Sequence, residues 1–218
     1  MSLALISLTL GAYLLGSIPF GVVWVKLFTG KDIRAVGSGR TGGTNAMRAA
    51  GFGVGLLTAL SDIFKGTLAV LAARWLLSPA EQNLGMVLTG LACILGHNYP
   101  LFLKFKGGAG GATCAGAALA IWPWSAAVVV PLGAAILYFV GYASVATLMA
   151  AVSATALFVY LAYGAKALDP VFIWFGVGSI ILLGWALRPN WARLLKGEER
   201  MVGRRAKQRP APPPNLTE

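Results

Sequence analysis

The sequence contains few charged residues, one histidine and two cysteines. Charged residues make up 11% of its 218 residues and hydrophobic residues 57%, whereas a soluble domain has about 25% charged residues. A single histidine, His97, excludes metal sites built from several histidines, and any step that needs an imidazole must use it. Cys93 and Cys114 lie in apolar surroundings without a C-x-x-C pattern, which indicates two buried thiols. We therefore expect neither a metal nor a cofactor.

The abundance of hydrophobic residues predicts an all-α integral membrane protein. The first hydrophobic stretch, 3–28, has no basic leader and contains Pro19 and Trp24, so we expect a retained span rather than a signal peptide. One membrane domain over 1–200 and a flexible, basic, Pro-rich tail over 201–218 are expected. Hydrophobic spans are expected near 3–28, 53–77, 84–104 and 170–187.

The stretch 107–165 contains no Lys, Arg, Asp or Glu and is long enough for two long helices or three short ones. Basic residues are concentrated in the loop after the first span, at 104–111 and in the tail. The positive-inside rule assigns all three regions to the cytoplasm, which requires an odd number of spans. We therefore expect about seven transmembrane helices, a short fourth helix at 112–121, a break at Pro123, an outside N-terminus and a cytoplasmic C-terminus.

The formal net charge is +11. In a soluble protein this charge would indicate nucleic acid as a partner. Here the basic residues flank apolar spans, so anionic lipid headgroups and phosphorylated substrates explain them better, and no nucleic acid is expected.

Two Gly-rich, basic, polar segments lie between the hydrophobic stretches. The first covers 37–45 and is followed by Arg48, and the second covers 96–113. Glycines let backbone amides turn toward a ligand, and amides, hydroxyls and basic side chains together bind phosphate. The alternative for the first segment is a plain turn between two helices. Its G-x-G-x-x-G pattern at 37–42 does not indicate a dinucleotide, because a membrane span precedes it instead of a strand.

Asp62 and Lys65 lie within the second span at a spacing that puts them on one helical face. Charges at membrane depth pair with each other or face a polar cavity, so the pair is either structural or part of a substrate cleft. His97 is likewise either a hydrogen-bonded structural residue or a functional one. His97 is not part of an H-x4-D catalytic pair, because Phe102 occupies the position of the Asp.

Two serines have similar alternatives. Ser17 precedes Pro19 and either satisfies the backbone of a proline kink or faces the cleft. Ser144 either caps a helix or supplies a cleft hydroxyl.

Taken together, these segments resemble the bacterial acyl-phosphate:glycerol-3-phosphate acyltransferases known as PlsY. The resemblance covers nearly the whole chain in order. The matching residues are 13–21, 32–34, 37–39, Gly42, 44–45, Arg48, Gly51, Asp62, 65–66, 96–97, Pro100, 105–108, Arg188, Asn190, 193–195, Gly197 and Glu199.

Four positions depart from the family pattern. Arg40 stands where the family usually has Asn, Ala109 where it has Lys, Gly141 where it has Arg, and Leu187 where it usually has His. If the two Gly-rich loops face each other, Arg40 is expected to replace the charge missing at Ala109. Otherwise the chain is a diverged relative with another acceptor or with weak activity.

The resemblance implies transfer of an acyl group from acyl phosphate to the sn-1 hydroxyl of glycerol 3-phosphate, which forms lysophosphatidic acid at a bacterial cell membrane. It implies membrane lipid as a partner and no obligate protein partner. The alternatives are an inactive or repurposed homologue and a membrane carrier of an organic phosphate. The expected catalytic residues are His97, Asn45 and Thr44. The expected phosphate-binding residues are Ser38, Gly39, Arg40, Arg48, Lys65, Lys106, Gly107, Gly108 and Asn190. Further cleft residues are Ser17, Asp62 and Ser144.

Overall fold

The structure is a computed structural model, in which residues 1–202 are described. The predicted tail over 201–218 therefore lies almost entirely outside the described residues. The helices are α1 (Leu3–Gly16), α2 (Phe20–Thr29), α3 (Gly43–Ala50), α4 (Phe52–Leu76), α5 (Pro79–Asn98), α6 (Gly111–Ile121), α7 (Ala126–Phe139), α8 (Ala143–Val159), α9 (Phe172–Ala186) and α10 (Arg188–Leu195). Short helical turns occupy Ile33–Ala35, Leu101–Leu103, Pro123–Ser125 and Tyr160–Gly164.

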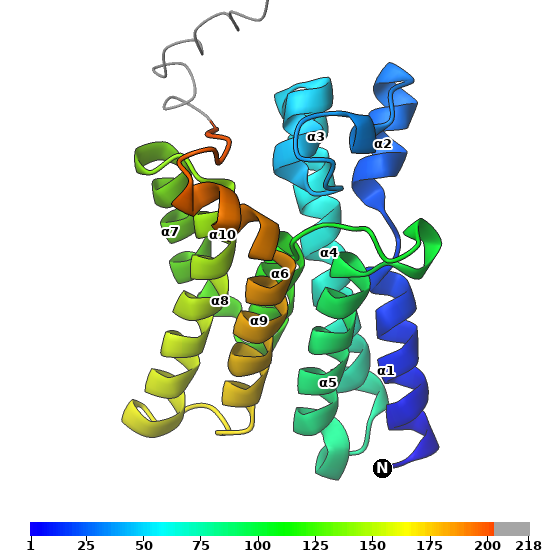
Figure 1. The fold of residues 1–218 in the computed structure, drawn as a ribbon. Coiled ribbons are helices and arrows are strands. Elements are labelled where there is room, and N and C mark those ends of the chain that lie inside the picture. The colour runs from blue at the N-terminus through cyan, green and yellow to red at the C-terminus, as the bar shows by residue number, and fades with distance from the viewer. Residues whose placement is uncertain (203–218) are drawn as a thin grey trace, which may run out of the picture.

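The helices run roughly along one axis and form an elongated bundle (Figure 1). Four helical segments of the described part are long and apolar enough to cross a membrane, and the bent pair α9–α10 makes a fifth. α6 and the segment Pro123–Phe139 are shorter apolar helices. The prediction of an all-α membrane protein is confirmed, and the short helix at 111–121 and the break at Pro123 occur as expected. The expected number of about seven spans stays a prediction.

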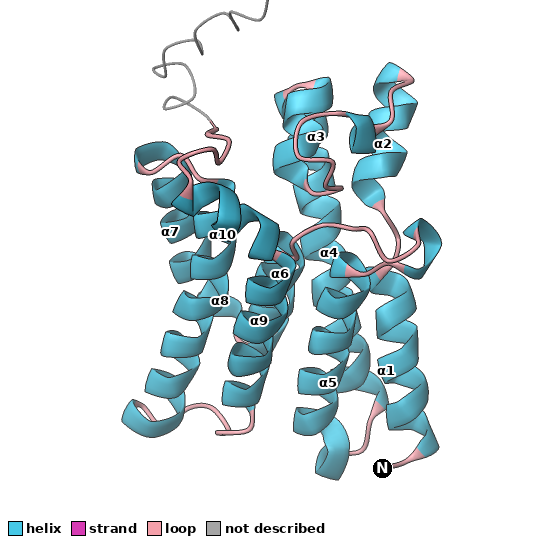
Figure 2. Cartoon of the chain, viewed as in Figure 1, coloured by secondary structure: helices cyan, strands magenta, loops and turns pink. Residues whose placement is uncertain are grey.

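The first span is broken between α1 and α2, halfway up the bundle (Figure 2). Pro19 stands at the break and cannot donate a backbone hydrogen bond. The Oγ atom of Ser17 donates to the carbonyl of Tyr13 at 2.9 Å and accepts from the N–H of Leu101 at 3.3 Å. The Tyr13 carbonyl also accepts from the N–H of Ser17 at 2.9 Å, so it is not a group freed by Pro19, and both interpretations of Ser17 stay predictions.

Two glycines allow α6 to lie directly against α4. A Cβ atom on Gly66 would overlap the carbonyl of Thr113, and one on Gly116 would overlap the carbonyl of Ile63. Small residues at a helix crossing let two backbones approach closely in a membrane protein. The crossing of α4 and α6 lies under the site that the next subsection describes.

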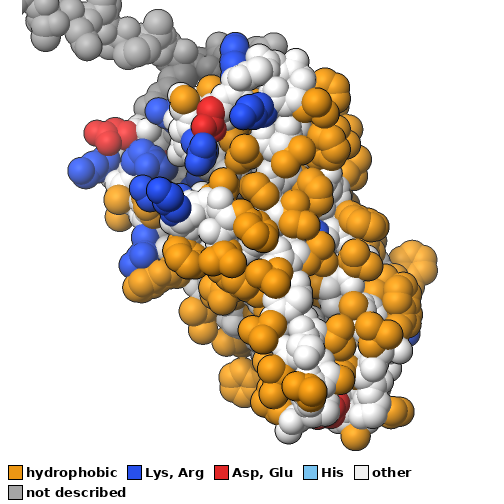
Figure 3. All heavy atoms as spheres, turned by 90° about the vertical axis from the view of Figure 1, so that its right-hand side faces the viewer, with side chains coloured by type: hydrophobic (Ala, Val, Ile, Leu, Met, Phe, Trp, Pro, Cys, Tyr) orange, Lys and Arg blue, Asp and Glu red, His pale blue; other side chains and the backbone are white. Residues whose placement is uncertain are grey.

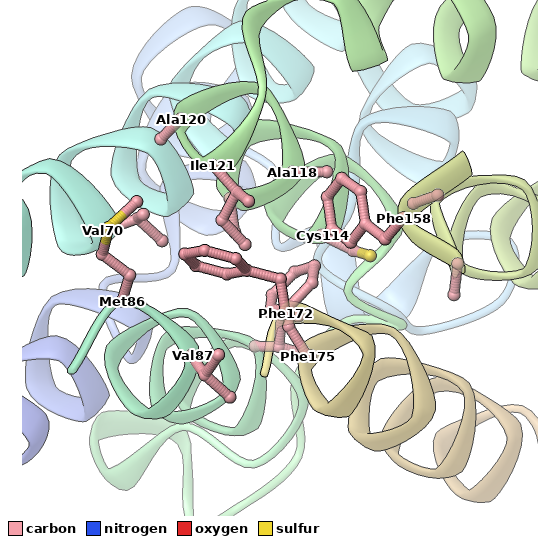
Figure 4. Packing of buried hydrophobic residues seen from close by; sticks show 14 of the residues in the cluster. Val70, Met86, Val87, Cys114, Ala118, Ala120, Ile121, Phe158, Phe172 and Phe175 are labelled. Carbon is pink, nitrogen blue, oxygen red and sulfur yellow. The ribbon is translucent and has the colours of Figure 1, made fainter. Parts of the chain in front are cut away.

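The hydrophobic core lies between α4, α5, α6, α8 and α9 (Figure 4). Phe158 of α8 and Phe175 of α9 meet with ring centroids 6.2 Å apart. Cys114 packs into this cluster, and both cysteines are free and buried, as predicted.

α9 and α10 meet at a bend of 62°. Pro189, near the start of α10, has no N–H for the carbonyl of Trp185 that precedes it by one turn. The Nε atom of Arg188 donates to that carbonyl instead, at 3.0 Å. The bend places α10 at the same end of the bundle as α2 and α3 (Figure 1).

Candidate active site

A cleft of about 300 Å³ opens at the end of the bundle that carries α3 and α10. Its walls are the loop before α3, parts of α3, α4, α5, α6, α8 and α10, the loop before α6, and the segment after α10. Nine of the predicted site residues line it: Ser38, Arg40, Thr44, Asn45, Arg48, Asp62, His97, Ser144 and Asn190. The sequence therefore identified residues from five separate segments that the fold brings together.

Asn45 builds the first Gly-rich loop. Its Oδ1 atom accepts from the N–H of Ser38 at 3.0 Å, and its Nδ2 atom lies 2.9 to 3.1 Å from the carbonyls of Ile33, Val36 and Arg40. A Cβ atom on Gly37, whose φ is 57°, would overlap Oδ1 of Asn45. The amide of Asn45 therefore shapes the loop.

Among residues 1–202, four arginines line the cleft: Arg40, Arg48, Arg193 and Arg200. Burial lowers the pKa of Arg40, with a smaller contribution from Arg193, and burial likewise lowers the pKa of Arg48. Arginine stays protonated in proteins, so both remain cations. The lining has fewer carboxylates, Asp62 and Glu199, which leaves the cleft positive and suited to phosphate.

The second Gly-rich segment folds back onto His97. The N–H of Gly108 donates to the carbonyl of His97 at 3.0 Å. A Cβ atom on Gly108 would overlap Nε2 of the His97 ring, and one on Gly107 would overlap the His97 carbonyl. These glycines are needed for close packing against His97, while residues 109–112 line the cleft instead.

Six predicted residues lie around the cleft or away from it. Gly39, Gly107 and Gly108 belong to the two loops but are not among the lining residues. Lys65 and Ser17 line a small adjoining cavity that shares Asp62 and His97 with the cleft. Lys106 is exposed on the loop between α5 and α6, as is Lys104.

Asp62, Lys65 and His97 form one buried polar cluster beneath the cleft. Nζ of Lys65 lies 2.9 Å from Oδ1 of Asp62, and both side chains are 1% exposed. The same Nζ lies 2.9 Å from Nδ1 of His97 and donates to the carbonyls of Gly16 and Ile18 at the break of the first span. The two residues thus form an ion pair, and Asp62 also lines the cleft, so a substrate role for the pair stays a prediction.

His97 has two possible partners in this cluster. Nδ1 of His97 lies 2.9 Å from Nζ of Lys65 and 3.4 Å from Oδ1 of Asp62. A neutral ring with the proton on Nε2 accepts from Lys65 at Nδ1, and a ring with the proton on Nδ1 donates to Asp62.

The segment after α10 closes one side of the cleft. Oε1 of Glu199 accepts from Nδ2 of Asn190 at 2.6 Å, and Oε2 accepts from Nε of Arg193 at 3.1 Å. The N–H of Val202 donates to the carbonyl of Gly141 at 2.8 Å. Arg193 and Glu199 belong to the residues that carry the family resemblance, but the sequence alone predicts no role for them.

Ser144 lies in the first turn of α8, is buried and lines the cleft. Its side chain makes no cap hydrogen bond, and its Oγ has no partner within residues 1–202. A cleft hydroxyl is thus the better of its two interpretations. Within the same residues no three His, Cys, Asp or Glu side chains are grouped closely enough to hold a metal ion.

The fold and the cleft define a polytopic membrane protein whose polar, cationic site is suited to anionic ligands. Residues 6–197 match the family described as glycerol-3-phosphate acyltransferase. The chain belongs to this family, and it is an acyltransferase of phospholipid synthesis.

Individual relatives agree with this assignment. A glycerol-3-phosphate acyltransferase of Thermus thermophilus is 40% identical over 198 residues, covering 91% of this chain and 95% of the relative. One from Bordetella pertussis is 41% identical over 197 residues, covering 89% and 90%.

Two crystal structures of the integral membrane protein PlsY have similar folds. Its glycerol 3-phosphate form has a TM-score of 0.78 and 36% identity, covering 91% of this chain and 96% of that one. Its lysophosphatidic acid form has a TM-score of 0.77 and 33% identity, covering 91% and 95%.

Proposed function

We propose that the cleft binds acyl phosphate and glycerol 3-phosphate and transfers the acyl group to the sn-1 hydroxyl. The observation that carries the proposal is the gathering of four arginines around a polar cleft at one end of an apolar bundle. Each substrate brings a phosphate to such a site, and the donor also brings a long acyl chain that suits the membrane. The bound ligands named for the two related crystal structures support glycerol 3-phosphate as acceptor and lysophosphatidic acid as product.

In this proposal Ser38 and Arg48 bind a substrate phosphate, because both face the cleft from one loop and the helix that follows it. Asn190 and Thr44 add polar contacts, and Asn45 acts by holding the loop. Lys106 is exposed, so the proposal assigns no phosphate contact to it.

The chemistry needs orientation more than a strong nucleophile. The acceptor hydroxyl attacks the acyl carbon, the bond from that carbon to the phosphate oxygen breaks, and inorganic phosphate leaves. The hydroxyl proton passes to a phosphate oxygen of a substrate, so the step needs no side-chain base. Cations around the cleft stabilise the charge that develops on the oxygens.

The cleft faces the cytoplasm in this proposal, with the N-terminus outside. Most of the basic side chains visible in Figure 3 lie toward the upper end of the molecule, where α2, α3 and α10 lie, and the positive-inside rule assigns this end to the cytoplasm.

Purified protein tests the proposal when it is mixed with labelled glycerol 3-phosphate and one of three donors: palmitoyl phosphate, palmitoyl-CoA or palmitoylated acyl carrier protein. We expect labelled lysophosphatidic acid with palmitoyl phosphate alone, together with one inorganic phosphate per product. Equal rates with palmitoyl-CoA would contradict the proposed donor. No product with any donor would indicate a repurposed homologue.

A further inference from the structure

The side chain of Arg40 extends from a fixed base at the edge of the cleft. Its carbonyl accepts from Nδ2 of Asn45 at 2.9 Å, and its N–H lies 3.4 Å from Oγ of Ser38. Gly39, directly before it, has a φ of 71°, a conformation that favours glycine. The guanidinium therefore starts from a defined position.

That guanidinium donates to three protein acceptors that lie far away in the sequence. Nη1 donates to the carbonyl of Gly108 at 3.1 Å, and Nη2 donates to Oδ1 of Asn190 at 2.9 Å. Nη2 also donates to the carbonyl of Ala186. Arg40 thus joins the loop before α3 to the second Gly-rich loop and to the corner between α9 and α10.

The bend between α9 and α10 makes one of these acceptors available. In a continuous helix the carbonyl of Ala186 would accept from the N–H of Asn190, four residues later. Here the N–H of Asn190 donates to the carbonyl of Leu187 instead, at 2.8 Å. The carbonyl of Ala186 is left for Arg40, which supplies a cation at the C-terminal end of α9.

The contacts of Arg40 fix one residue that lines the cleft, Asn190, and one residue of the adjoining loop, Gly108. Asn190 is 6% exposed, and its amide is held by Arg40 through the oxygen and by Glu199 through the nitrogen. Gly108 is held with its backbone against the His97 ring. Loss of the guanidinium would free both at once.

We propose that Arg40 is a positioning residue. Its guanidinium holds Asn190 and Gly108 in place at the edge of the cleft instead of binding substrate phosphate. The inference rests on the proposed function of the cleft as the active site. It replaces the sequence-based expectation that Arg40 binds phosphate and restores the charge missing at Ala109. A planar guanidinium can hold several acceptors at once in fixed directions, whereas a lysine ammonium cannot reproduce that geometry.

Variants at position 40 separate geometry from charge. Arg40→Lys keeps the positive charge but loses the planar guanidinium, and Arg40→Gln loses both the charge and the guanidinium. We expect both to lower kcat about tenfold or more, with the KM for glycerol 3-phosphate within about threefold of wild type, because displaced groups slow the chemical step. Lys31→Gln is the matched control, since Lys31 is exposed on the same loop, and it should leave both constants unchanged.

Two combined variants sharpen the test. Arg40→Gln with Asn190→Ala should lose no more activity than the more damaged single variant, because the two residues act as one unit. Ala109→Lys added to Arg40→Gln should restore nothing. The proposal would be overturned by any of three results: full activity in Arg40→Lys, a raised KM in Arg40→Gln, or rescue of Arg40→Gln by Ala109→Lys. So would a fall in rate that only follows the amount of folded protein, measured by size-exclusion chromatography in detergent.

A failure of the proposed function remains distinguishable. Wild-type protein that is inactive with palmitoyl phosphate would contradict the proposed donor. Calorimetric titration of the same variants with glycerol 3-phosphate then tests Arg40 alone. A Kd of Arg40→Gln for glycerol 3-phosphate within about threefold of wild type supports the positioning role. A Kd raised by about tenfold or more would mean that Arg40 binds the substrate directly.

Discussion

Nζ of Lys65 lies 2.9 Å from Nδ1 of His97, and this contact joins a buried lysine to the only histidine in the sequence. Lys65 belongs to α4 and His97 to the last turn of α5, so the contact also ties these helices together where the first span breaks. The packing of the bundle and the orientation of a cleft residue therefore depend on the same ammonium group.

Lys65→Met should destabilise the protein strongly, because it leaves the carboxylate of Asp62 buried without its cation. Removal of one partner of a buried ion pair costs about 3–5 kcal/mol. The apparent Tm in detergent should fall, and the double variant Lys65→Met with Asp62→Asn should recover part of the loss. A double variant less stable than Lys65→Met alone would contradict this role for the pair.

Arg48→Ala should raise the KM for at least one substrate by about tenfold, since a charge-assisted contact contributes about 1.5–3 kcal/mol. Lys104→Ala is the control, because Lys104 is exposed outside the cleft. Initial rates over a range of each substrate give the two constants. Equal effects of the two variants would mean that only general basicity matters.

Gly108→Ala should reduce kcat by about a hundredfold, because the added Cβ overlaps Nε2 of His97 and displaces the ring. Gly184→Ala is the matched control. In the last turn of α9, a Cβ atom built on Gly184 would have no neighbour within 4 Å outside the local helix backbone. The control should keep its rate, and wild-type kinetics in both variants would show that the overlap is relieved without cost.

Reporter fusions test the topology. Glu81 lies at the start of α5 and Glu199 after α10, at opposite ends of the bundle (Figure 1). A reporter that is active only in the cytoplasm should be active after Glu199 and inactive after Glu81. The opposite pattern would invert the proposed orientation, and activity at both positions would contradict the spanning arrangement.

Much of this architecture is predictable from local sequence. The hydrophobic runs predict the spans, and Pro123 between two tryptophans predicts the end of α6, because these signals act within a few residues. The spacing of Asp62 and Lys65 likewise predicts a shared helical face, and the structure contains that pair.

Other features depend on contacts between distant segments. Nothing near Arg40 in the sequence indicates that its partners are Gly108, Ala186 and Asn190. The amide of Asn45 resembles a ligand group in the sequence, yet the turn of the loop directs it to backbone atoms. Lys106 belongs to a basic motif, yet it is exposed. The two residues before it, Lys104 and Phe105, have a left-handed backbone conformation, which the sequence does not predict.

The gathering of arginines at one end of the bundle has a kinetic consequence. A cleft lined by one sign of charge attracts anions from a distance and raises their rate of encounter, and this attraction weakens as ionic strength rises. Both proposed substrates and the departing inorganic phosphate are anions, so the same field that speeds capture also slows release. Added salt should therefore reduce kcat/KM more steeply than kcat, and the rate of turnover would reflect a balance between collecting substrates and letting phosphate go.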